Sequence, residues 1–141
     1  MKRSFPEIDE LMVADLMTVD PVIIGVDAPL EEAERLMREM HISGLPVVDH
    51  HEALVGVISQ TDVLEDGGAP MAILLRRKPS GLRVGELMSS PAVTVQLTAP
   101  LVEAARLMRD NRIHRVVAVD ERGRPVGVLS ASDFVALYAD R

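Results

Sequence analysis

The strongest constraint in this chain of 141 residues is an internal repeat. The segment VADLM, which begins at Val13, recurs as VGELM at Val84, and APLEEAERLMR at Ala28 recurs as APLVEAARLMR at Ala99. Both pairs are 71 residues apart (84 − 13 and 99 − 28), and the register continues without a gap as far as Asp133. A register kept over this length indicates two copies of one supersecondary unit.

The repeat divides the chain into an N-terminal segment (1–12), a first repeat (13–66), a linker (67–82) and a second repeat (83–139). The linker carries glycine and proline at both ends, which predicts a short helix between them, over residues 69–77. A single repeat would leave much of its sheet uncovered. We therefore expect the two repeats to pack sheet to sheet, related by a pseudo-two-fold axis.

Each repeat shows the same order of apolar patterns, which predicts β-α-β-β-α and an α/β (α+β) fold class. The predicted strands are, in the first repeat, Val22–Ile24, Leu45–Val48 and Leu54–Ile58 and, in the second, Val93–Val95, Val116–Val119 and Val126–Leu129. Pro29 and Pro100 mark the first turn of the helix that follows the first strand, with Asp27 and Thr98 as capping candidates. A final helix follows the third strand of each repeat.

Composition excludes several classes of function. Hydrophobic residues make up 48% of the chain but aromatic residues only 2%, which predicts an aliphatic core. The absence of cysteine excludes disulfides, thiolate nucleophiles and cysteine-ligated zinc, and a net charge of -7 disfavours binding to nucleic acid. The sequence shows no apolar run of membrane-spanning length and no secretory signal, so we expect a cytoplasmic protein with no membrane contact. The four histidines have no metal-ligand spacing, and no catalytic signature is present.

Two polar corners end the third predicted strands: SQTD (Ser59–Asp62) and SASD (Ser130–Asp133). A carboxylate at such a junction can accept hydrogen bonds from both hydroxyls of a ribose. The neighbouring hydroxyls of Thr61 and Ser132, with the first amides of the following helix, favour a phosphate. The alternative is that each Ser-x-x-Asp segment only caps the helix, because Ser, Thr and Asp are preferred N-cap residues.

These segments resemble the cystathionine β-synthase (CBS) domain family. The resemblance rests on ISGLPVVD from Ile42, LVGVISQTD ending at Asp62, and VGVLSASD ending at Asp133, and it covers nearly the whole chain. It implies a non-catalytic regulatory module, a Bateman module, that binds an adenosyl ligand in the clefts between the repeats. AMP, ADP and ATP are the foremost ligands implied, with S-adenosylmethionine and NAD(H) also compatible. It further implies a homodimer that signals to another protein, which the sequence does not identify.

Carried over position by position, the resemblance implies three groups of site residues. Ribose and phosphate contacts fall on Ser59, Thr61, Asp62, Ser130, Ser132 and Asp133. Adenine contacts fall on the first strands and the segments before the second strands, namely Val22, Ile23, Ile24, Ile42, Gly44, Pro46, Val93, Thr94, Val95, Ile113 and Val117. Polyphosphate contacts fall on the basic residues of the second repeat, Arg112, His114 and Arg115.

The basic residues mark a difference between the repeats. The second repeat has RIHRVVAVD where the first has HISGLPVVD, so it carries three basic side chains in this segment and the first carries one. Arginine suits phosphate because its planar fork donates several hydrogen bonds, although ordinary surface charge is the alternative interpretation. For the whole chain, the alternative to a nucleotide sensor is a dimerisation scaffold whose ligand clefts are vestigial.

Overall fold

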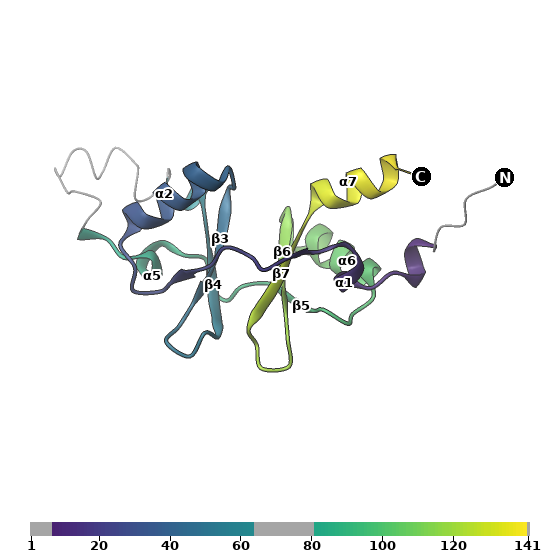
Figure 1. The fold of residues 1–141 in the computed structure, drawn as a ribbon, viewed down its shortest axis with the longest axis horizontal. Coiled ribbons are helices and arrows are strands. Elements are labelled where there is room, and N and C mark those ends of the chain that lie inside the picture. Colours follow the sequence, from purple (N-terminus) through teal and green to yellow (C-terminus); the bar gives the residue numbers. More distant parts are fainter. Residues whose placement is uncertain (1–6, 64–80, 141) are drawn as a thin grey trace. The chain divides into compact units, whose positions relative to one another are not determined.

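The structure is a computed structural model that describes residues 7–63 and 81–140. Two compact units divide these residues: 22–63 with 81–92, called here the first-repeat unit, and 7–21 with 93–140, called the second-repeat unit. Each unit contains one small sheet and its own helices (Figure 1). The predicted α/β (α+β) class is confirmed.

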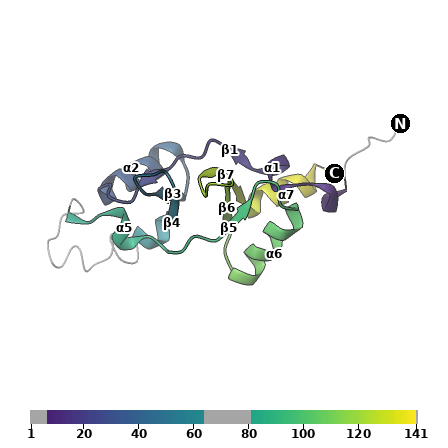
Figure 2. The same cartoon turned by 90° about the horizontal axis from the view of Figure 1, so that it is seen from below.

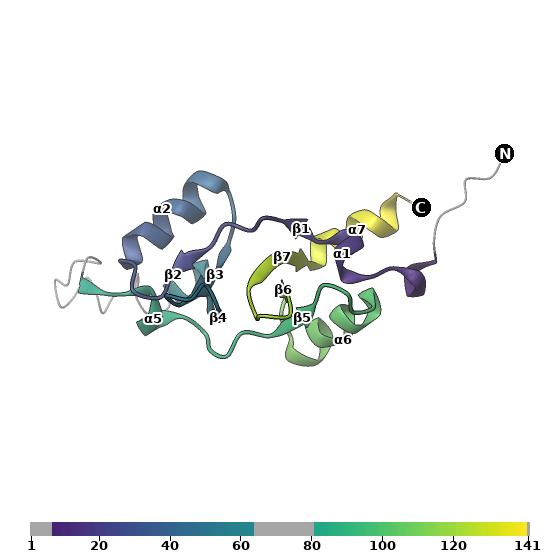
Figure 3. The ribbon, with the colours of Figure 1, turned by 60° about the horizontal axis from the view of Figure 1, so that its bottom comes forward.

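The first-repeat unit is built on the three-stranded sheet β2-β3-β4. Its elements are β2 (Ile24–Gly25), α2 (Leu30–Met40), β3 (Gly44–Val48), β4 (Leu54–Ser59), α3 (Gln60–Asp62) and α5 (Val84–Leu87). β2 runs parallel to β3, and β3 pairs antiparallel with β4. Figure 3 shows α2 alongside this sheet. Leu30, Leu45 and Ile58 are fully buried between the helix and the sheet, so the aliphatic core follows the predicted pattern.

The second-repeat unit repeats this plan with one added strand. Its elements are η1 (Ile8–Glu10), α1 (Val13–Leu16), β1 (Thr18–Val19), β5 (Thr94–Gln96), α6 (Leu101–Asn111), β6 (Arg115–Val119), β7 (Pro125–Ser130) and α7 (Ala131–Ala139). The sheet order is β1-β7-β6-β5. Figure 2, with Figure 1, shows α6 and α7 on the same side of this sheet. Its buried core includes Leu101, Val116 and Leu129, at the same repeat positions as the core of the first-repeat unit.

The short helix that opens each sequence repeat packs in the unit of the other repeat. Val13, at the start of α1, donates its amide to the carbonyl of Ala99 at 2.9 Å, and Val84, at the start of α5, donates to Ala28 at 2.9 Å. Both valines are fully buried. The sequence repeats therefore exchange their opening segments, which the spacing of the repeat alone does not reveal.

This exchange also corrects the expected helix caps. Pro29 and Pro100 occupy the N-cap positions of α2 and α6, and neither Asp27 nor Thr98 caps its helix through a side chain. The first helical amides instead donate to backbone carbonyls. The Leu30 amide donates to the Leu82 carbonyl at 2.9 Å, and the Leu101 amide donates to the Leu11 carbonyl at 2.8 Å. A carbonyl from the exchanged segment satisfies the donor that a capping side chain would otherwise bind.

The remaining boundaries differ only slightly from those predicted. β2 begins at Ile24 and β5 at Thr94, so most of the predicted Val22–Ile24 strand precedes the ladder. The order β-α-β-β-α is complete in the second repeat, and in the first it is seen as far as α3. The predicted linker helix (69–77) lies outside the described residues.

Candidate functional site

Each Ser-x-x-Asp corner caps the junction of a strand and a helix, and in the first repeat the cap is reciprocal. At the end of β4, Ser59 donates its amide to Asp62 Oδ2 at 2.9 Å, and the Asp62 amide donates to Ser59 Oγ at 3.1 Å. At the end of β7, Ser130 donates its amide to Asp133 Oδ2 at 2.8 Å. The first corner has the full capping-box geometry, and the second has the carboxylate half of it. The capping interpretation therefore holds fully in the first repeat and for the carboxylate alone in the second.

The caps leave part of each carboxylate available. Only Oδ2 is used in the cap, and each carboxylate oxygen carries further acceptor capacity. Asp62 Oδ1 receives a long contact from Ser89 Oγ at 3.5 Å. For Asp133, the structure records no hydrogen bond to Oδ1 among the described residues. Both aspartates are partly exposed, so the same side chain can cap a helix and still accept a hydrogen bond from a ligand.

Further hydroxyls lie at the same corners. Thr61 and Ser132 are exposed, one residue before each carboxylate. In the second repeat, the Oγ atoms of Ser130 and Ser132 are 2.8 Å apart and share a hydrogen bond. The corner in the second repeat thus presents two hydroxyls and one carboxylate at the first turn of α7.

The backbone fixes the segments before β3 and β6 against these corners. The amide of Gln60 donates to Ser43 at 2.9 Å, and the amide of Ala131 donates to His114 at 2.8 Å. In the antiparallel ladders, Gly44 pairs with Ser59 and Arg115 pairs with Ser130. The structure therefore brings the predicted residues before each second strand next to the predicted ribose and phosphate residues of the same repeat.

Several predicted adenine-contacting side chains are buried, Ile24 and Val95 within the core clusters and Pro46 and Val117 outside them. Ile24, Pro46, Val95 and Val117 are buried, so these residues offer a ligand their backbone rather than their side chains. Others of the set are more accessible. Ile23 and Thr94 are exposed, while Val22, Ile42, Gly44, Val93 and Ile113 are partly buried.

The basic residues of the second repeat surround the start of β6. Arg112 ends α6 in the left-handed conformation with φ 55°, and both Arg112 and His114 are exposed. Arg115 is half-buried, and this burial lowers the pKa of its guanidinium from the usual range. In the first repeat, His41, Ser43 and Gly44 stand at these positions.

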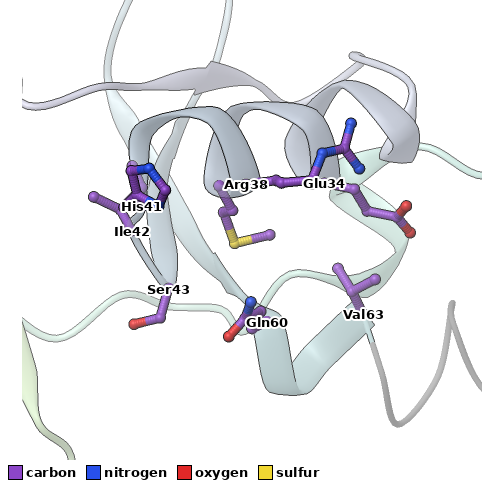
Figure 4. Close-up of a pocket in the computed structure, with 8 residues that line it drawn as sticks. Glu34, Arg38, His41, Ile42, Ser43, Gln60 and Val63 are labelled. Atoms are coloured by element: carbon purple, nitrogen blue, oxygen red, sulfur yellow. The ribbon is translucent and has the colours of Figure 1, made fainter.

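A pocket of about 820 Å³ opens in the first-repeat unit between α2, the segment before β3 and the start of α3 (Figure 4). It is lined by Glu34, Met37, Arg38, His41, Ile42, Ser43, Gln60 and Val63. Only Ile42 belongs to the predicted set of site residues. Glu34 and Arg38 belong to no motif, and Gln60 is the unspecified second residue of the SQTD corner; their gathering depends on how α2 packs beside α3.

Residues 7–63 and 81–140 hold neither a cluster of metal-ligating side chains nor a helix suited to a membrane. No three His, Asp or Glu side chains gather so that they could hold a metal ion. No helix in this part of the chain has the length and apolar character needed to cross a membrane.

Comparison with known families gives a match to the CBS domain model at residues 13–67 and 84–140. The matched segments cover both repeats and most of the chain. Their spacing agrees with the internal repeat that is visible in the sequence.

Several known proteins are similar to this chain in sequence or in structure. The chain is 33% identical over 133 residues to inosine-5'-monophosphate dehydrogenase of Methanocaldococcus jannaschii, covering 94% of this chain but 24% of the enzyme. It thus spans about a quarter of that relative's length. The structure of CBSX2, a CBS-pair protein of Arabidopsis thaliana, in complex with AMP matches with a TM-score of 0.76 and 30% identity, covering 92% of this chain and 98% of that one. The CBS domain pair of protein MJ0100, in complex with 5'-methylthioadenosine and S-adenosyl-L-methionine, matches with a TM-score of 0.75 and 26% identity, covering 92% and 97%.

Proposed function

The chain belongs to the CBS domain family, as a tandem pair of these domains, and on this premise we propose that it is a non-catalytic regulatory module that binds an adenine nucleotide. The ligand would lie between the repeats and contact the Ser-x-x-Asp corners. AMP, ADP or ATP is the foremost ligand, and S-adenosylmethionine and NAD(H) are further members of the same adenosyl class. The structures of CBSX2 with AMP and of the MJ0100 pair with S-adenosyl-L-methionine support an adenosyl ligand.

The observation that carries the proposal is the spare capacity of the corner carboxylates. Asp62 and Asp133 each use Oδ2 for the helix cap, which holds the side chain in place before any ligand arrives. Oδ1 can then accept a charge-assisted hydrogen bond from a ribose hydroxyl. A group that the fold already orients loses little conformational freedom on binding.

We assign the phosphate contacts to different groups in the two repeats. In the second repeat, Ser130 and Ser132 provide hydroxyls, and Arg112, His114 and Arg115 provide positive charge for a polyphosphate. In the first repeat, Ser59 and Thr61 provide hydroxyls and His41 is the matching basic side chain. The site of the second repeat should therefore favour more highly charged nucleotides.

Regulation requires that ligand occupancy reach a partner. A ligand that binds one arrangement of the two repeats more tightly shifts the population toward it, and a protein that contacts this arrangement senses the change. The partner that we propose is another protein, reached from a homodimer of this chain in the cytoplasm.

A dimerisation scaffold is the second candidate function, and the exposed apolar side chains favour it. On α7, Val135 and Tyr138 are 68% and 78% exposed, and on α2, Met40 is 51% exposed. Apolar groups of this size on helices are suited to association with another surface. A scaffold would retain this association and bind no nucleotide.

The decisive experiment measures binding of AMP, ADP, ATP, S-adenosylmethionine and NADH to ligand-stripped protein by calorimetry and thermal shift. A one-site ligand at a hundred times its Kd should add about 2.7 kcal/mol of stability. Asp62→Asn and Asp133→Asn keep an oxygen for the helix cap but remove the charge. Each should weaken binding at its own corner by roughly tenfold or more, the cost of a charge-assisted hydrogen bond.

Each single variant is the matched control for the other, because both carboxylates accept the amide of the serine three residues earlier through Oδ2. If both variants bound every adenosyl ligand as the unmodified chain does, the ribose assignment would be wrong. If the stripped, folded protein bound none of these ligands, the dimerisation scaffold would replace the nucleotide sensor as the proposed function.

A further inference from the structure

The pocket of the first-repeat unit has an apolar floor. Met37 from α2 and Val63 at the end of α3 are 3% and 5% exposed, and the partly buried Ile42 lies between these elements. The pocket volume of about 820 Å³ is within the range of ligand-binding pockets, about 300–1,000 Å³. The floor can therefore bury the apolar body of a small molecule.

Polar side chains with unused hydrogen-bonding capacity surround this floor. Figure 4 shows Glu34 and Arg38 extending from α2, His41 at the end of that helix and Gln60 across from them at the start of α3. None of these four side chains forms a hydrogen bond or ion pair with another described residue. Arg35, on the same helix, is by contrast paired with Glu39 at 3.4 Å.

The pocket is separate from the carboxylate of the nearby Ser-x-x-Asp corner. Gln60 lines the pocket, whereas Asp62 turns back to the Ser59 amide at 2.9 Å and toward Ser89 Oγ at 3.5 Å. Two residues that are two positions apart on an α-helix differ by a rotation of about 200° about the helix axis. The two side chains therefore lie on opposite sides of α3, and a ligand in the pocket need not contact Asp62.

The second repeat does not reproduce this set of polar groups. At the matching positions, Ala105 replaces Glu34 and Ala131 replaces Gln60. Arg109, which matches Arg38, is held by Asp110 at 2.9 Å. Phe134 stands where the first repeat has Val63, and it packs against the core of its unit.

The charges of the pocket indicate the class of ligand. Arg38 and Glu34 contribute opposite charges, so the pocket carries little net positive charge to hold a polyphosphate. One guanidinium fork suits one carboxylate, which it can bind through two parallel hydrogen bonds. We propose that this pocket binds an amphipathic monocarboxylate, with the carboxylate on Arg38 and the apolar body on Met37, Ile42 and Val63.

The test uses hexanoate as the probe and hexanamide as its uncharged counterpart, with the full chain labelled at the methionine methyl carbons. The Met37 methyl, assigned with Met37→Leu, reports binding by NMR, and the Met108 methyl at the matching position is an internal control. We expect hexanoate to move the Met37 signal saturably and to leave Met108 unchanged. Arg38→Gln should weaken hexanoate binding roughly tenfold, the loss of one charge-assisted interaction, and leave hexanamide unaffected. Arg109→Gln is the matched control and should change neither the binding of hexanoate nor that of hexanamide.

Three results would overturn the proposal. The first is the absence of a saturable Met37 shift with hexanoate. The second is equal hexanoate binding in Arg38→Gln and in the unmodified chain, because the carboxylate would then not be recognised by the guanidinium. The third is competition between AMP and hexanoate at Met37, which would make the pocket part of the nucleotide site. Failure of AMP to bind anywhere would leave this proposal standing while ending the proposed nucleotide function.

Discussion

The two repeats share one scaffold almost position by position. β3 and β6 have the same sequence of partly buried and buried residues, and so do β4 and β7. The ladders even shift register at matching places, between Val47 and Val48 and between Ala118 and Val119. What the repeats share is therefore the set of buried positions that holds sheet and helix together.

The repeats differ where the strands begin and the side chains are accessible. The first has Ser43 and Gly44 at the start of its central hairpin, and the second has His114 and Arg115. The pocket beside α2 adds a second difference, because its acid and amide are replaced by alanine in the second repeat. Duplication has preserved the packing and left the ligand chemistry of the two copies free to diverge.

The largest expected loss of stability, and the first test of the shared scaffold, comes from replacing the first residue of α2 or α6. Leu30 and Leu101 are both fully buried at matching positions. Leu30→Ala and Leu101→Ala should each lower the free energy of unfolding by about 2–5 kcal/mol, through lost burial and the cavity left behind. Urea denaturation followed by circular dichroism measures both losses. A cost below about 1 kcal/mol for only one of them would show that the two cores are not equivalent.

A smaller difference in the free energy of unfolding should distinguish alanine variants at the matching glycines of the two units, Gly56 and Gly127. A Cβ at Gly56 would lie 2.7 Å from both the Met88 sulfur and the backbone oxygen of Ser89. A Cβ at Gly127 would clash with the flexible Met17 side chain but lie 3.1 Å from the nearest backbone oxygen. Both alanine variants overpack their sites, at a cost of about 1–3 kcal/mol, with Gly56→Ala the more destabilising because a backbone atom cannot move aside as easily as a methionine.

The same denaturation experiment measures this difference. Gly25→Ala is the control, because a Cβ there meets nothing within 4 Å. A larger loss for Gly127→Ala than for Gly56→Ala would contradict the distinction between backbone and side-chain obstacles.

Much of the fold could be predicted from the sequence because buried positions recur at a fixed spacing. The central strands were predicted to within one residue, since their apolar runs coincide with the hydrogen-bonded ladder. The first strand of each repeat was predicted to begin before its observed start, because apolar residues indicate burial and do not indicate which residues form the hydrogen bonds of the sheet. Val22 and Val93 pack against the cores, yet β2 begins at Ile24 and β5 at Thr94.

The features that the sequence did not predict depend on contacts between distant segments. No local pattern shows that Leu82 and Leu11 provide the carbonyls at the starts of α2 and α6. The corner carboxylates could be proposed from the sequence because they belong to a motif, whereas Arg38 and Gln60 come together only through packing. Local preference predicts elements and caps, and tertiary contacts can replace those caps.

The smallest predicted effect concerns the two hairpin turns in acid. Amides of His51 and Ala53 donate to Asp49 Oδ1 at 2.8 and 3.0 Å, and amides of Arg122 and Arg124 donate to Asp120 Oδ1 at 2.8 and 3.0 Å. These hydrogen bonds hold the pKa of each carboxyl below its ordinary value of 3.8, and the nearby basic side chains lower it less. A depressed carboxyl pKa stabilises the folded state above pH 3.8, and this stability is lost as the pH falls through the folded value.

Asp49→Asn and Asp120→Asn should therefore make stability less dependent on pH below about pH 4, each by a similar small amount. His51→Gln and Arg122→Gln keep the backbone amides and should leave both carboxyl pKa values depressed, which NMR titration of the carboxyl carbons can measure. A return of either pKa to 3.8 in these variants would mean that side-chain charge, and not the turn backbone, lowers it. Because the turns carry histidine in one repeat and arginine in the other, the comparison separates the backbone, which the repeats share, from the charges, which they do not.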